Sequence, residues 1–121
     1  MSVGAHPELA LIYAVPNGEL RSKGTAGKLK SQGVKPGVPD LVLPVARGGY
    51  FGMYIEMKRQ RGGSLSPDQK WWRDQLIDQG YYWHVFKGFR AAEPKILEYL
   101  SWVSTKHYLT KDIYTPTMES S

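Results

Sequence analysis

The amino-acid sequence predicts an α/β domain in which a mixed central β-sheet is flanked by helices. Short runs rich in apolar, β-branched and aromatic residues predict strands, and clear helix-start and helix-stop residues separate them. Strands and helices that alternate in this way favour a sheet with helices packed against it. The expected strands are residues 9–15, 41–43, 50–58 and 81–87, and the expected helices are residues 25–32, 67–79 and 91–103.

The first expected strand, residues 9–15, is an apolar run that ends at the turn signal Pro16-Asn17-Gly18. The Pro7-Glu8 pair before it also suits a helix start, so a helix is the alternative for this segment. Residues 25–32 form the first expected helix. It ends at Gly33, because glycine readily adopts the conformation that follows a helix C-terminus.

Residues 41–43 and 50–58 are expected to pair as a hairpin through Arg47-Gly48-Gly49. Pro36 and Pro39 exclude a helix before the first of these strands and favour an extended approach to it. The two strands would then lie side by side near the centre of the sheet.

The second strand of this hairpin has two different faces. Successive side chains of a strand point to opposite faces, so Glu56 and Lys58 share one face. Met53, Ile55 and Met57 lie on the other face. This pattern predicts a polar cleft in front of the strand and a helix packed behind it.

The helix expected at residues 67–79 has a strong start signal. Ser66 is the N-cap, Pro67 occupies the first helical position, and Gln69 at the third position completes a capping box. Gly80 ends the helix.

Gln69 has two interpretations. As a capping residue it satisfies only a backbone donor. Its helical spacing to Trp72 and Leu76 also places it on the face turned toward the sheet, within reach of the polar cleft.

Residues 81–87 form the last expected strand, and the helix at residues 91–103 follows, with Pro94 in its first turn. One apolar stripe of this helix is expected to face the sheet. Its members are Ala92, Ile96, Leu100 and Val103.

The 121 residues predict one domain over residues 1–103, followed by a polar segment, 104–121, that forms a frayed tail or a dimer arm. The sequence has no apolar run long enough to span a membrane and no signal sequence, so a cytoplasmic location is expected. It has no cysteine, which excludes disulfides and thiolate metal sites.

The net charge of +5 is unevenly distributed. Two basic clusters surround the carboxylates at residues 40 and 56, and such clusters bind a polyanion such as DNA. A solvated basic face without a partner is the alternative. The candidate DNA-binding residues are Asn17, Arg21, Lys23, Lys28, Lys30, Lys35, Arg59 and Arg61. The glycine after Asn17 allows the backbone to approach a phosphate closely.

Asp40, Glu56 and Lys58 form a candidate metal site. Asp40 lies at the start of one hairpin strand and Glu56 near the end of the other, so the two carboxylates can share one ion. Magnesium prefers oxygen ligands, and the Met57 carbonyl could supply another. Lys58 could orient or help deprotonate an attacking water. The alternative is a surface ion pair between Glu56 and Lys58. The three histidines lack metal-ligand spacing, although His84 could approach the cleft.

These motifs resemble the VRR-Nuc branch of the PD-(D/E)xK nucleases over roughly residues 9–100. The residues that carry the resemblance are Val15-Pro16-Asn17-Gly18, Lys28-Leu29-Lys30, Gly33, Gly37-Val38-Pro39-Asp40, Tyr54-Ile55-Glu56-Met57-Lys58, Leu65-Ser66-Pro67-Asp68-Gln69 and Gly80-Tyr81. The resemblance implies a restriction-endonuclease-like core and a Mg²⁺- or Mn²⁺-dependent, structure-selective DNA endonuclease. Stand-alone members of this branch are associated with phages and bacteria, and with homodimers that cut four-way junctions.

By the same resemblance, Asp40 and Glu56 are expected to bind the metal, Lys58 to act as the catalytic lysine, and Gln69 to be the glutamine of the following motif. Relatives usually carry a further acidic residue on an N-terminal helix, for which Glu8 is the nearest candidate. The alternative functions are a non-catalytic, basic DNA-binding module and, less favoured by the basic surface, a small-molecule phosphatase.

Overall fold

The computed structural model describes residues 5–16, 33–59 and 61–109. Within these residues, four strands form one sheet in the order β1-β2-β3-β4. The strands are β1 (Tyr13–Ala14), β2 (Leu41–Leu43), β3 (Met53–Lys58) and β4 (Tyr82–Lys87). β2 is antiparallel to both β1 and β3, whereas β4 is parallel to β3, so the sheet is mixed, as the sequence predicts.

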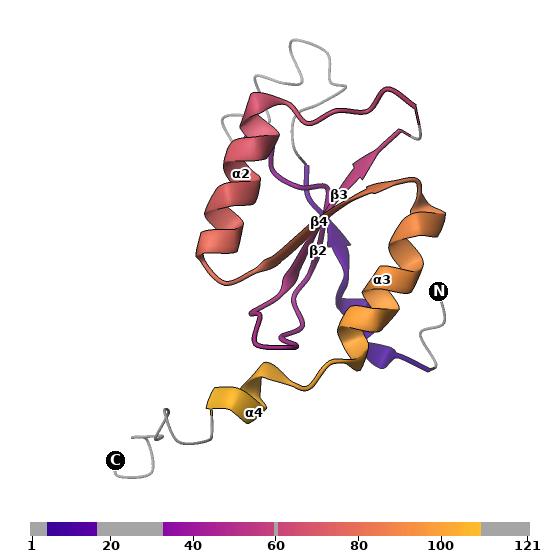
Figure 1. Cartoon of the computed structure of the whole chain (residues 1–121), viewed down its shortest axis with the longest axis vertical. Coiled ribbons are helices and arrows are strands. Elements are labelled where there is room, and N and C mark those ends of the chain that lie inside the picture. Colours follow the sequence, from indigo (N-terminus) through magenta and orange to yellow (C-terminus); the bar gives the residue numbers. More distant parts are fainter. Residues whose placement is uncertain (1–4, 17–32, 60, 110–121) are drawn as a thin grey trace.

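Two long helices cover the two faces of this sheet. Helix α2 (Pro67–Asp78) connects β3 to β4, because parallel neighbours need a crossover of this kind. Helix α3 (Phe89–Ser101) follows β4 and lies on the other side of the strands from α2 (Figure 1). The short elements η1 (Pro7–Leu11), a 3-10 helix, and α4 (Thr105–Leu109) lie near the two ends of the chain. No helix in the described part of the chain is long and apolar enough to cross a bilayer.

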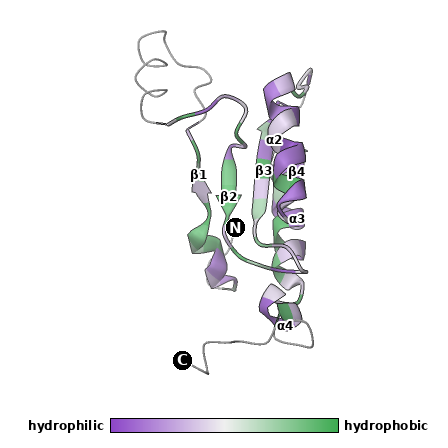
Figure 2. Cartoon of the chain, turned by 90° about the vertical axis from the view of Figure 1, so that its left-hand side faces the viewer, coloured by the Kyte–Doolittle hydropathy of each residue, from purple (hydrophilic) through white to green (hydrophobic). Residues whose placement is uncertain are grey.

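The apolar core lies between the sheet and α3. Alternate residues of β3 and β4 point to this side, and the apolar stripe of α3 packs against them. Figure 2 shows the contrast between the apolar β2 and the mostly hydrophilic α2. The buried core residues are Leu9, Leu43, Val45, Met53, Ile55, Phe86, Ala92, Ile96, Tyr99 and Leu100. The polar residues of β3 therefore face α2.

The strand expected over residues 9–15 is wrong for residues 9–11, where the alternative, a helical start at Pro7, is confirmed. Residues 7–11 form η1 and only residues 13–14 form a strand, instead of one strand over residues 9–15. Pro7 at the helix start has the fixed φ that suits a helical turn, and this local preference prevails over the apolar run. The helix expected at residues 25–32 lies outside the described residues.

The later elements follow the prediction with three corrections. The strand expected at residues 50–58 begins at Met53, because the chain still turns at Tyr50, whose N–H donates to the Arg47 carbonyl. Helix α3 begins at Phe89, so Pro94 lies inside the helix instead of in its first turn. Val103 lies beyond the helix end and is 52% exposed, so it does not continue the buried stripe of Ala92, Ile96 and Leu100. The strand expected at residues 81–87 is confirmed as β4.

The segment after α3 differs from the expected frayed tail over residues 104–109. Ser104 forms a β-bridge with Arg47, and α4 begins at Thr105. Thr105 is buried; its backbone N–H donates to the Ala46 carbonyl and its hydroxyl donates to the Tyr50 carbonyl. These contacts fix the start of the segment on the domain. Residues 110–121 lie outside the described part of the chain.

Gly37 fixes the approach of the chain to β2. Its φ is +84°, and a Cβ there would lie 2.5 Å from the Cβ of Asp68, so this turn packs directly on the start of α2. We expect Gly37→Ala to lower the free energy of unfolding by about 2–4 kcal/mol, from the unfavourable φ plus the steric clash. Urea denaturation followed by circular dichroism measures this change.

Gly49→Ala is the matched control for this substitution. Gly49 also has a positive φ, +92°, but a Cβ there would meet nothing within 4 Å. Only the backbone strain then applies, about 1–2 kcal/mol. Equal losses in the two variants would show that the contact between Gly37 and Asp68 does not constrain the fold.

Candidate active site

Asp40 and Glu56 lie opposite each other at one end of the sheet. The antiparallel register pairs Leu41 with Ile55, and one further step places Asp40 beside Glu56. Asp40 keeps the strand geometry on its other side, where the Val15 N–H donates to its carbonyl at 2.8 Å. Opposed residues of an antiparallel pair point to the same face. The two carboxylates predicted to share an ion are therefore neighbours.

Pro39 and Asp40 change the hydrogen bonding of β3 at this point. Asp40 Oδ2 accepts a hydrogen bond from the Met57 N–H at 2.8 Å, in the position where a longer β2 would supply a carbonyl. The N–H and C=O of one strand residue point to the same side, so the Met57 carbonyl also points toward Asp40. Continuing the register places Pro39 opposite Met57, and proline has no N–H to donate to that carbonyl.

Gln69 connects the two other polar residues of the site. Its Oε1 accepts from Lys58 Nζ at 2.6 Å, and its Nε2 donates to Glu56 Oε2 at 3.1 Å. Glu56 is 1% exposed and Gln69 is 2% exposed, so this contact is shielded from solvent. The side-chain amide therefore holds the carboxylate and the ammonium group in fixed positions under α2.

The same amide also caps the helix. Oε1 of Gln69 accepts from the Ser66 N–H at 2.9 Å, and the Ser66 hydroxyl accepts from the Gln69 N–H at 3.1 Å. The predicted capping box is thus confirmed, and Gln69 also reaches the cleft. The two interpretations of Gln69 are not exclusive, because a carbonyl oxygen can accept two hydrogen bonds.

The oxygen atoms of this site suit a hard divalent cation. Asp40 and Glu56 lie opposite each other at the end of β3, and the Met57 carbonyl points to the same side of the strand as the N–H that Asp40 binds. Mg²⁺ or Mn²⁺ prefers such oxygen ligands while keeping several waters. Within residues 5–16, 33–59 and 61–109, no group of three or more His, Cys, Asp or Glu residues could hold a metal ion. The protein ligands here are thus fewer than a closed structural site needs, and substrate or water would complete the coordination.

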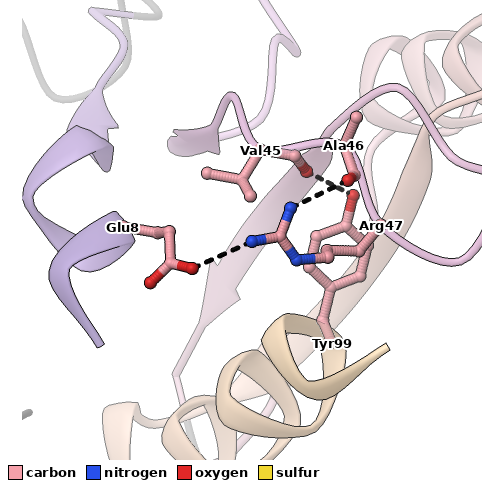
Figure 3. A network of polar contacts seen from close by, with 5 residues as sticks. All are labelled: Glu8, Val45, Ala46, Arg47 and Tyr99. Atoms are coloured by element: carbon pink, nitrogen blue, oxygen red, sulfur yellow. Dashed lines mark hydrogen bonds and ion pairs between the residues drawn. The ribbon is translucent and has the colours of Figure 1, made fainter. Parts of the chain in front are cut away.

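Glu8 does not supply a third carboxylate to this site. Its Oε2 lies 2.9 Å from Arg47 Nη2, and η1 reaches Arg47 as Figure 3 shows. Because β1 is antiparallel to β2, η1 before β1 lies near the C-terminal end of β2, whereas Asp40 lies at its N-terminal end.

The contacts around Arg47 are structural. Arg47 also donates to the Ala46 carbonyl, and the Tyr99 hydroxyl donates to the Val45 carbonyl at 2.7 Å. Burial raises the pKa of Tyr99 to about 12, so the phenol stays a donor at neutral pH. These bonds join η1, the segment after β2 and α3.

His84 does not approach the cleft. It shares a strand face with Phe86, whose ring centroid is 4.6 Å away, and this face packs against α3. Burial lowers the pKa of His84, with the positive charge of Lys95 as a smaller cause. The residue belongs to the core side of the sheet.

The predicted DNA-binding residues fall into two groups. Lys35, Arg59 and Arg61 are described and exposed, and all three lie close in sequence to the site residues. The others lie outside the described residues: Asn17, Arg21, Lys23, Lys28 and Lys30.

Sequence reasoning missed Lys87 and Trp72. Lys87 pairs with Lys58 in the parallel register and is exposed, so a second positive charge lies on the α2 side of the sheet. Strand parity would have identified it once β3 and β4 were known to be parallel neighbours. Trp72 lines a cavity beside the site. Its spacing from Gln69 indicated that it lies on the same face of α2. The sequence did not indicate that residues 33–38 lie opposite it.

Comparisons with known proteins found similarity over most of this chain. A family model described as the VRR-NUC domain matches residues 8–90. Among solved structures, a chain described as a VRR_NUC domain protein superposes with a TM-score of 0.70 and is 31% identical in sequence. The match covers 86% of this chain and 79% of that chain. No curated protein matches.

Proposed function

Because this chain belongs to the VRR-NUC family and so carries a nuclease-family domain, we propose that it is a Mg²⁺- or Mn²⁺-dependent endonuclease that cuts branched DNA. The observation that supports the proposal best is the joint placement of Asp40, Glu56, Lys58 and Gln69 at the end of β3. A surface ion pair between Glu56 and Lys58 would not need a buried carboxylate or an amide between the two groups.

We assign the metal to Asp40, Glu56 and the Met57 carbonyl. A divalent cation at these oxygens would polarise the scissile phosphate and make its bound water more acidic. Asp40 is positioned by the Met57 N–H, and Glu56 by the Gln69 amide. Both carboxylates are thus oriented by the protein itself, which reduces the reorganisation needed when substrate binds.

Lys58 is the residue we assign to the water and the phosphate. Its ammonium group has three N–H donors, and Gln69 Oε1 accepts from it at 2.6 Å. This bond holds Nζ at the amide that also binds Glu56, and it leaves other N–H donors for an anionic transition state. The exposed Lys35, Arg59, Arg61 and Lys87 would contact the DNA backbone.

We further propose that the substrate is a four-way junction and that the active form is a homodimer. A two-fold dimer presents two cleavage sites to a symmetric substrate. Exposed apolar side chains near β1, at the sheet edge, support an interface there: Leu11 is 52% exposed and Tyr13 is 53% exposed. Light scattering coupled to size exclusion should give twice the mass of one chain at micromolar concentration.

The activity is tested with a labelled four-way junction and a linear duplex of the same sequence, in Mg²⁺, in Mn²⁺ and in EDTA. We expect cutting of the junction with either metal, slower cutting of the duplex, and none in EDTA. Binding of both DNAs without cutting in any buffer would instead support the non-catalytic module. The observation that favours the non-catalytic module is that the described residues supply only two carboxylates to the site.

A further inference from the structure

A cavity of about 490 Å³ lies between α2 and the segments that lead into and out of the sheet. Val15 and Val38 form part of one wall, and Trp72 of α2 forms part of another. Lys35 also lines it. The volume is within the range of sites that hold small organic ligands, and most of the lining is apolar.

The cavity lies next to the candidate active site, because residues that line it are bonded to site residues or close to them in the chain. Val15 donates its N–H to the Asp40 carbonyl at 2.8 Å, and Val38 precedes Asp40 by two residues. On α2, Trp72 follows Gln69 by three positions and so lies on a neighbouring part of the same helix face. A group bound in the cavity would therefore lie beside a phosphate held at Asp40 and Glu56.

The lining suits a flat, uncharged ring attached to an anionic chain. Trp72 is half-buried, and Trp71 packs against it edge to face, with ring centroids 5.3 Å apart and an interplanar angle of 89°. None of the described residues that line the cavity is acidic, and the exposed Lys35 can bind a phosphate. Bases stack on aromatic side chains whatever their sequence.

We propose that this cavity receives one unpaired nucleobase of the DNA, stacked on Trp72, next to the phosphate that is cut. A base within a duplex is stacked and paired and cannot enter without unstacking, which costs a few kcal/mol. A base at a single-stranded end is already free to enter, and a base pair next to a branch point lacks a stacking neighbour on one side when the arms are unstacked, so it opens at lower cost. The cavity would thus contribute to selection of branched DNA over a linear duplex. This inference rests on the proposed nuclease function of the neighbouring site.

The test measures binding in EDTA, where no cutting is expected, to two duplexes. One carries a single unpaired 2-aminopurine and the other is fully paired. With the native protein we expect 2-aminopurine fluorescence to fall on binding, because the base stacks on the indole. Trp72→Leu should remove this quenching and weaken binding of the first duplex about tenfold, while binding of the paired duplex stays unchanged.

Two variants control the measurement. Trp72→Phe keeps an aromatic face and should retain most of the affinity and the quenching. Trp71→Leu removes the neighbouring tryptophan, which is 56% exposed and does not line the cavity, and should leave the quenching in place. Circular dichroism establishes that each variant is folded.

A third duplex, with an abasic site in place of the unpaired base, tests the inference on the native protein alone. It should bind about tenfold more weakly than the 2-aminopurine duplex. Equal affinity for these two DNAs, or equal weakening of all duplexes by Trp72→Leu, would overturn the inference. Cutting of junctions is measured separately. If the native protein cuts junctions but does not quench 2-aminopurine, only the proposed base-binding cavity is refuted. If it quenches 2-aminopurine but does not cut in any metal, only the proposed nuclease activity is refuted.

Discussion

Asp40→Asn and Glu56→Gln are each expected to reduce metal-dependent cutting of DNA by about a thousandfold. Each substitution removes one negative charge from the oxygen atoms assigned to the metal, and loss of a metal or electrostatic contact in an active site costs several kcal/mol of barrier. Both replacements keep the shape of the side chain. The asparagine oxygen can still accept from the Met57 N–H, and the glutamine oxygen can still accept from Gln69.

The measurement is the single-turnover rate on a labelled junction at saturating protein, together with the dissociation constant in EDTA. Binding should change by less than about threefold, since the basic residues that contact the backbone remain. Asp78→Asn is the matched control, because Asp78 is an exposed acid at the end of α2. This variant should cut at the native rate. If Glu56→Gln cuts at the native rate, the assignment of the buried Glu56 carboxylate to the metal is wrong.

Gln69→Ala is expected to lower both stability and activity. The substitution removes hydrogen bonds to Glu56, to Lys58 and to the Ser66 N–H. Hydrogen bonds to charged groups contribute about 1.5–3 kcal/mol and a cap about 1 kcal/mol. The three bonds share one side chain and the bond to Lys58 is only partly buried, so these contributions do not add, and we expect a loss of about 2–4 kcal/mol in the free energy of unfolding. Because the Lys58 and Glu56 side chains lose their positioning partner, cutting should fall about a hundredfold.

Ser66→Ala separates the two functions of Gln69. It removes the hydroxyl that accepts from the Gln69 N–H but leaves the Gln69 amide and its contacts with the cleft. We expect a loss of about 1 kcal/mol in stability and nearly native cutting below the melting temperature. Urea titration and single-turnover cutting, measured on both variants, give the comparison. An equal loss of activity in both would mean that Gln69 acts only through the stability of α2.

Local signals predicted the elements that neighbouring residues determine. The Ser66-Pro67 start of α2 and its capping box were readable, because every group involved lies within one helical turn. The side-chain alternation of β3 was readable because it follows from strand geometry alone. The pairing of residues 41–43 with 53–55 followed from the short connection between them.

Contacts between distant segments were not readable in the same way. The sequence offered Glu8 as a third acidic residue, but its ion pair with Arg47 depends on which end of the sheet η1 reaches. The start of α3 at Phe89, the exposure of Val103 and the docking of Thr105 depend on how the chain leaves β4 and returns to the domain. In each case, packing prevailed over the local pattern.

The sequence by itself determined the mixed α/β class, the capped helix and the shared strand face of Glu56 and Lys58, because these depend on residues close together in the chain. Only the tertiary structure decided that Asp40 lies beside Glu56 and that Gln69 joins Glu56 to Lys58. The crossover through α2 places the third residue of this helix over the end of β3. The register of a sheet and the seating of a helix are set by burial of side chains from across the whole chain, which no local pattern contains.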